Sequence, residues 1–241
     1  MLIFILIMSA FFNYLKMNSL TNILNRCKAF SKIILSPKPY KKLDFSEANK
    51  DLLQRDLSET KTFSSYVFEE MLSNNAFIGI GGYDENRIIY RHRQHFTKEE
   101  NPRCIHLGTD IWTDAGDPVY APLDREIHSF TFNDQYGDYG PTIILKHKLE
   151  ETIFYTLYGH LSLDSLDGLF EGKRILSGEK IASIGDYPTN GDWTPHLHFQ
   201  IIADMSVYKG DFPGVCSLQD REYYLSVCPD ANLILRIEEN N

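Results

Sequence analysis

The stretch Thr194-Pro-His-Leu-His-Phe-Gln-Ile-Ile202 constrains the fold of this chain more than any other. Successive side chains of an extended strand point to opposite faces, so His196 and His198 share one face. Leu197 and Phe199 then point into a core, and the aromatic and β-branched neighbours favour a strand. The sequence therefore predicts a strand that presents two imidazoles on the face opposite its apolar side chains.

A second fragment, His106-Leu-Gly-Thr-Asp110, places an imidazole and a carboxylate four residues apart, again on one face if the chain is extended. A catalytic zinc site takes three nitrogen or oxygen ligands from the protein and leaves one position for water. His106, Asp110 and one of His196 and His198 would complete such a set. The pattern predicts one Zn²⁺ and leaves open which of the two histidines binds it.

A third fragment, Tyr158-Gly-His-Leu-Ser162, follows an apolar run and places His160 directly after a glycine. We expect a strand over 152–158 that ends at Gly159. A residue just beyond a strand end can reach into a cleft. His160 is therefore a further candidate for the site.

In this order and at these spacings, the three fragments resemble the lysostaphin/LytM-type zinc metallopeptidases over roughly residues 103–203. The resemblance implies a mainly β fold with an antiparallel β-sheet core of that type and an N-terminal helical extension beside it. It also implies that His106, Asp110 and His198 bind the metal. His160 and His196 are then the catalytic residues, which act on water and on the developing oxyanion.

The function that the resemblance implies is a zinc metalloendopeptidase, a hydrolase that cuts amide bonds in peptidoglycan peptides of the cell wall by metal-activated water. Three alternatives stay open. The chain could be a non-hydrolytic binding or regulatory module of the same fold. It could be a peptidase-like module with a substrate outside the cell wall. The zinc could also be structural, which would require a fourth protein ligand.

The loop Thr189-Asn-Gly-Asp-Trp-Thr-Pro195 departs from the glycine- and serine-rich loop that many members of that family carry at this place. Trp193 is the residue of interest in it. We expect its indole to be either a cleft wall that binds substrate or a hydrophobic plug under the loop. This difference in the loop leaves the predicted metal ligands unaffected, but it leaves open which substrate the chain binds.

Composition narrows the choice of partners. The formal net charge of −9 argues against nucleic acid, because phosphate binding requires clustered Lys and Arg. A peptide or peptidoglycan substrate is compatible with this charge. The hydrophobic fraction of 43% is ordinary for a globular protein with a core.

Cysteine usage favours free thiols, because the four cysteines are scattered and do not form the dense framework of a small secreted module. Two alternatives remain. Cys216 and Cys228 could pair in an oxidising compartment, and Cys104 lies close enough to His106 in sequence to be a soft zinc ligand.

The first sixteen residues include the most apolar run of the chain, Met1 to Phe12. Its length resembles a signal-peptide hydrophobic region more than a bilayer span, but no Lys or Arg precedes it and no clear cleavage site follows. Residues 1–16 are thus an apolar leader or a mis-assigned start. Any membrane contact is expected through this run alone, and a cell-envelope or exported location and a cytoplasmic one both stay open.

The rest of the chain divides into three parts. Residues 17–75 predict a helical extension, 76–206 the β core and 207–241 a C-terminal cap. Within the extension, 45–55 and 61–72 have helical patterns, and Phe63, Tyr66, Val67 and Met71 share a face that either packs on the core or forms a lid over the zinc. At the start of the core, 76–82 and 87–90 predict two strands.

Overall fold

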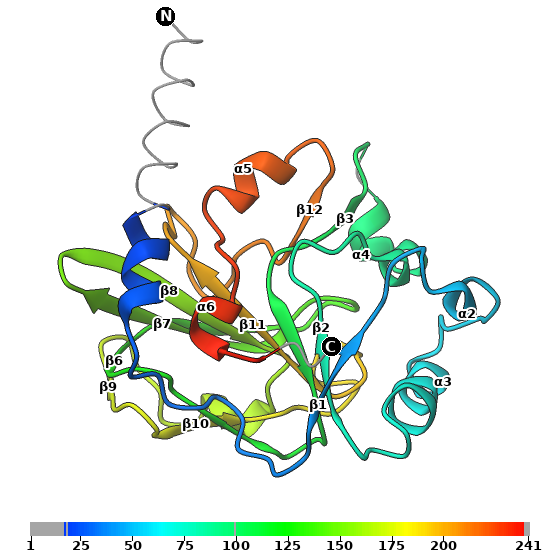
Figure 1. Cartoon of the computed structure of the whole chain (residues 1–241), viewed down its shortest axis with the longest axis horizontal. Coiled ribbons are helices and arrows are strands. Elements are labelled where there is room, and N and C mark those ends of the chain that lie inside the picture. The colour runs from blue at the N-terminus through cyan, green and yellow to red at the C-terminus, as the bar shows by residue number, and fades with distance from the viewer. Residues whose placement is uncertain (1–16, 18, 99, 239–241) are drawn as a thin grey trace, which may run out of the picture.

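The computed structural model describes residues 17, 19–98 and 100–238 (Figure 1). The apolar leader expected over residues 1–16 lies outside these residues. The largest sheet has eight strands in the order β1-β2-β4-β11-β8-β7-β6-β9. The strands are β1 (Tyr40–Leu43), β2 (Ile78–Gly81), β4 (Thr109–Trp112), β11 (His196–Ile202), β8 (Thr152–Gly159), β7 (Gly140–Leu149), β6 (Arg125–Asn133) and β9 (Arg174–Ile175).

All neighbours in this sheet are antiparallel except β1 and β2. Two smaller antiparallel sheets pair β10 (Lys180–Ser183) with β5 (Pro118–Tyr120) and β12 (Val215–Ser217) with β3 (Arg103–His106). The predicted mainly β fold with an antiparallel core is confirmed.

Helices are short and lie outside the sheet. Residues 19–26 are helical. The others are α2 (Lys50–Leu53), α3 (Thr60–Ser65), the π-helix η1 (Tyr66–Met71), the 3₁₀ helices η2 (Ile88–His92) and η3 (Leu163–Leu166), α4 (Gln94–Thr97), α5 (Arg221–Leu225) and α6 (Asn232–Leu235). Among the described residues, no helix has the length and apolar character needed to span a bilayer.

Strand β11 lies between β4 and β8, and all seven of its residues are buried. Its side chains alternate between the two faces of the sheet, as the sequence predicts. Leu197, Phe199 and Ile201 belong to the main hydrophobic core. His196 and His198 lie on the opposite face, where the candidate site forms.

The N-terminal extension is helical but also contributes a strand to the sheet, since β1 pairs with β2. The helix expected over 61–72 forms as α3 and η1, whereas only α2 forms within 45–55. Phe63, Tyr66 and Val67 are buried in one cluster with Trp112 of β4. This face of the extension therefore packs on the β core.

The strand predicted over 87–90 is wrong, because η2 occupies this segment. Residues three apart eclipse in a 3₁₀ helix but point to opposite faces of a strand. The helix brings Arg87 and Tyr90 together, with Nη1 of the arginine donating a hydrogen bond of 3.0 Å to the tyrosine hydroxyl. Both side chains then line the cavity beside the candidate site.

The C-terminal segment reaches the same region through β12. Val215 pairs with His106, and the backbone N–H of Leu107 donates to the carbonyl of Gly214 at 2.8 Å. The segment beyond the β core is thus hydrogen-bonded to the strand that ends in a predicted metal ligand.

We expect Phe199→Ala to lower the free energy of unfolding by about 3–5 kcal/mol, because it empties a fully buried site in the main core. Phe132→Ala is the matched control, since Phe132 also lies in a strand but is 41% exposed. Urea unfolding of both variants measures the difference. A loss below about 1 kcal/mol for Phe199→Ala would contradict the assigned core.

Candidate metal centre

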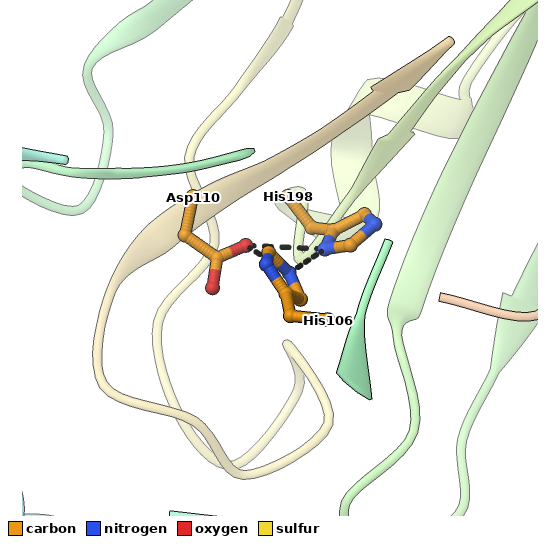
Figure 2. A group of neighbouring side chains, drawn as sticks. All are labelled: His106, Asp110 and His198. Atoms are coloured by element: carbon orange, nitrogen blue, oxygen red, sulfur yellow. Dashed lines mark hydrogen bonds and ion pairs between the residues drawn. The ribbon is translucent and has the colours of Figure 1, made fainter. Parts of the chain in front are cut away.

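The predicted metal ligands lie together in the structure (Figure 2). Asp110 of β4 is paired with His198 of β11 in the sheet register, and His106 is the last residue of β3, which precedes β4 in the chain. His106 Nε2 lies 3.0 Å from His198 Nδ1 and 3.2 Å from Asp110 Oδ1. His198 Nδ1 lies 3.1 Å from the same oxygen. The three ligand atoms therefore form a nearly equilateral triangle.

Hydrogen bonds on the far sides of both rings show which nitrogens carry protons. His106 Nδ1 lies 2.9 Å from the carbonyl oxygen of Gly82, which can only accept, so this nitrogen holds the proton. His198 Nε2 lies 2.9 Å from Gln200 Oε1 and donates to it. The amide nitrogen of Gln200 donates in turn to the carbonyl of Pro213 at 3.1 Å, which sets the orientation of the amide.

With both imidazoles in the neutral form that binds metal, three unprotonated atoms therefore face one another: Nε2 of His106, Nδ1 of His198 and a carboxylate oxygen of Asp110. Lone pairs at these separations repel unless a cation lies among them. Zinc bonds of about 2.0–2.2 Å in tetrahedral geometry separate ligand atoms by roughly 3.3–3.6 Å. The observed 3.0–3.2 Å is close to that range, so the donor set fits a zinc ion.

The triangle requires close packing around His198. A Cβ atom added at Gly108, in the middle of the His-x3-Asp motif, would lie 2.7 Å from the His198 ring. Any larger residue at this position would displace the imidazole. Glycine in that motif is therefore a packing requirement of the site.

Asp110 is held from its other side by Arg87, which is 1% exposed. Nη1 of the arginine donates to Asp110 Oδ2, and its Nε donates to Glu85 at 2.8 Å. Burial alone would raise the pKa of Asp110, but His106 and Arg87 hold it well below its usual range. Burial, reinforced by Arg87, lowers the pKa of His106 to about 4. At neutral pH the site thus offers a carboxylate and a neutral imidazole, the forms that bind metal.

The two remaining histidines of the motifs lie beside the triangle and are also neutral. His160 Nδ1 donates to the carbonyl of Asn190 at 2.8 Å, and His196 Nδ1 donates to that of Thr194 at 2.6 Å. Their ring centroids are 4.3 Å apart. Burial lowers the pKa of His196 to about 4 and that of His160 well below its usual value. Both rings therefore keep an unprotonated Nε2.

His160 has a left-handed backbone with φ of 62°, and its N–H donates to the carbonyl of Tyr139 at 2.8 Å. This turn directs the side chain from the end of β8 toward the cavity. His196 lies flat on Trp112, with ring centroids 4.2 Å apart and an interplanar angle of 14°. His196 Nε2 is 3.9 Å from Asp110 Oδ2, outside the triangle.

A cavity of about 160 Å³ gives access to this group. Asp110, His160, His196 and His198 line it, together with Trp193 and residues of η2, α4 and the C-terminal segment 211–215. Asp138 and Asp211 also face it, and burial raises the pKa of both carboxyl groups. Among the described residues, none before Arg87 lines this cavity, so the structure gives no support to a lid formed by the N-terminal extension.

Trp193 combines features of both expected roles. It is 4% exposed and clusters with Tyr90, Phe96 and Val215, as a plug would. It also lines the cavity, with its ring centroid 6.2 Å from that of His196. The structure therefore places the indole in the wall of the site.

Sequence patterns did not identify Arg87 or Gln200. The sequence does indicate Gln200, because it continues the His-x-His alternation as a polar residue among Phe199, Ile201 and Ile202. No pattern indicates Arg87, because a strand was predicted over its segment. All four cysteines are free thiols, as expected, and none belongs to the ligand group.

Comparison with known proteins found a family match for the central part of the chain. Residues 104–209 match the model of peptidase family M23, and they include every predicted ligand and catalytic histidine. A comparison with curated proteins gave no match.

Solved structures show similarity over part of the chain. A zinc-containing peptidase from Vibrio cholerae is 30% identical over 41% of this chain and 27% of its own length, with a TM-score of 0.33. The catalytic domain of the antimicrobial peptidase lysostaphin from Staphylococcus simulans is 21% identical, with 50% and 80% covered and a TM-score of 0.34. The catalytic domain of the prophage-encoded M23 protein EnpA from Enterococcus faecalis is 19% identical, with 41% and 68% covered and a TM-score of 0.33.

The family match spans all three histidine-containing motifs and the strands that bring them together. The segment of this chain over residues 104–209 is therefore similar to peptidase family M23.

Proposed function

We propose that this protein is a zinc-dependent metalloendopeptidase that hydrolyses amide bonds in peptides, with peptidoglycan peptides as the substrate class. The observation that carries the proposal is the triangle of unprotonated ligand atoms beside two neutral histidines in one cavity. A hydrolase needs each of these parts, whereas a structural zinc site would close with a fourth ligand. In the described part of the chain the ligand group has three members.

His106, Asp110 and His198 would hold the metal. Zinc in this position supplies Lewis acidity, which polarises a scissile carbonyl and acidifies water. Gly82, Gln200 and Arg87 keep the ligand atoms deprotonated and oriented, as outer-shell partners do in metal sites.

His160 and His196 would move protons. Each has its Nδ1–H fixed on a backbone carbonyl, which leaves Nε2 able to accept a proton from the attacking water. Once protonated, the same atom donates a hydrogen bond to the oxyanion or a proton to the leaving amine. Such contributions are worth about 10²–10⁴ in rate for each group.

The proposal of a peptidoglycan substrate is supported by the match of residues 104–209 to the family, and by a net charge that disfavours nucleic acid. Incubation of the zinc-loaded protein with peptidoglycan sacculi and a peptide panel, with fragments read by mass, tests it. We expect soluble muropeptide fragments that disappear when a chelator removes the zinc. Bound zinc without turnover on any of these substrates would favour the non-hydrolytic module instead.

Substitution of the two histidines of β11 should separate metal binding from chemistry. We expect His198→Ala to lose both zinc and activity, because a ligand is gone. His196→Ala should keep one zinc and lower kcat by about 10²–10⁴, and His160→Ala should behave in the same way. Metal analysis and steady-state kinetics measure the two effects. Zinc that is lost in His196→Ala but retained in His198→Ala would reverse the assignment.

Gln200 offers a test of the outer hydrogen bonds. We expect Gln200→Leu to weaken zinc binding by about 10- to 100-fold, because His198 Nε2–H loses its acceptor and the Nδ1 lone pair is no longer fixed. Competition with a chromogenic chelator measures this affinity. Gln135→Leu, at an exposed position, is the control and should leave it unchanged. Equal affinities in the two variants would contradict the role of Gln200.

A further inference from the structure

A second cavity, of about 260 Å³, adjoins the one at the metal centre. It lies between the N-terminal extension and η2, and the two cavities share Ile89 and Trp193 in their walls. Most of its lining is apolar, including the half-exposed Leu53 of α2. One indole therefore separates it from the catalytic histidines, since the Trp193 ring centroid is 6.0 Å from that of His160 and 6.2 Å from that of His196.

The polar side chains of this cavity all carry positive charge. Arg55, Arg91 and Arg93 line it, and none of the described residues in its wall is acidic. This is unexpected in a chain whose formal net charge is −9. Arg55 and Arg91 are exposed and paired with Glu70 and Glu47 at the rim.

Arg93 differs from the other two because it is buried and forms no ion pair with any of the described residues. It is 4% exposed, and its Nη2 donates to the carbonyl of Asp192 at 3.0 Å. Its Nη1 is buried and has no hydrogen-bond partner among the described residues. The guanidinium carbon lies 3.7 Å from the Trp193 ring centroid.

This arrangement is costly unless a ligand compensates it. A buried cation loses its hydration, and a buried donor without an acceptor adds a further penalty. Burial accordingly lowers the pKa of Arg93. The cation–π contact with Trp193 and the hydrogen bond to Asp192 hold the guanidinium in place, so a ligand would meet a pre-oriented donor.

We propose that the second cavity is a subsite for the substrate, in which Arg93 binds a carboxylate and the apolar walls bind the side chain beside it. The ligand class is thus an apolar amino acid residue with a free carboxylate. The choice of a peptide ligand rests on the proposed peptidase function. Arg93 would act in specificity, because it contacts the substrate one indole away from the reacting groups.

A binding experiment tests this independently of hydrolysis. The full-length protein is titrated with N-acetyl-leucine and with N-acetyl-leucinamide, which differ only in the carboxylate, and indole N–H resonances are followed by NMR. We expect the acid to bind about 10- to 100-fold more tightly than the amide, as one charge-assisted hydrogen bond at a buried site would give. Inorganic phosphate, which lacks an apolar part, should bind more weakly than the acid.

Arg93→Gln should remove the preference for the acid, whereas Arg55→Gln and Arg91→Gln should retain most of it because these arginines already have partners. A preference that persists in Arg93→Gln would indicate binding elsewhere, for example at the zinc, and would overturn the proposal. Equal affinity of the wild-type protein for acid and amide would also overturn it, whether or not the variant folds. Failure of the peptidase proposal gives a different result, namely acid-selective binding without cleavage of any substrate.

Discussion

The pairing of β4 with β11 is the constraint on which the rest of this structure depends. Their register puts Asp110 opposite His198, and alternation along β11 keeps the histidines on one face and the core residues on the other. A slip of one residue would turn His198 toward the core and Phe199 toward the cavity. The fold and the metal centre are therefore specified by the same alternation, since burial of Leu197, Phe199 and Ile201 fixes the register that assembles the ligands.

Around the ligands, neighbouring groups fix where protons reside. A carbonyl and an amide oxygen hold the outer protons of His106 and His198, and a buried arginine holds the second oxygen of Asp110. These contacts come from the residue after β2, from β11 and from the segment before η2, so distant parts of the chain prepare the site before any metal arrives. The resulting convergence of lone pairs is unfavourable by itself, and a divalent cation relieves it.

The sequence was informative where local pattern and chemistry coincide. Alternation predicted β11, and spacing with a family resemblance predicted the ligands and the two histidines beside them. It was uninformative where contacts join residues far apart in the chain. Arg87 directly precedes the 3₁₀ helix at residues 88–92, and its guanidinium lies over the rings of Phe45 and Tyr90 where it reaches Asp110. The second cavity likewise arises from contact between the extension and η2, which no periodicity encodes.

The proposed function requires that three nitrogen and oxygen atoms of this chain form an open zinc site. X-ray absorption spectroscopy of the zinc-loaded protein at the zinc edge tests it most directly. We expect four nitrogen or oxygen neighbours at about 2.0–2.2 Å, two of them with the scattering signature of imidazole. A sulfur neighbour at about 2.3 Å, or a third imidazole that closes the site, would contradict it.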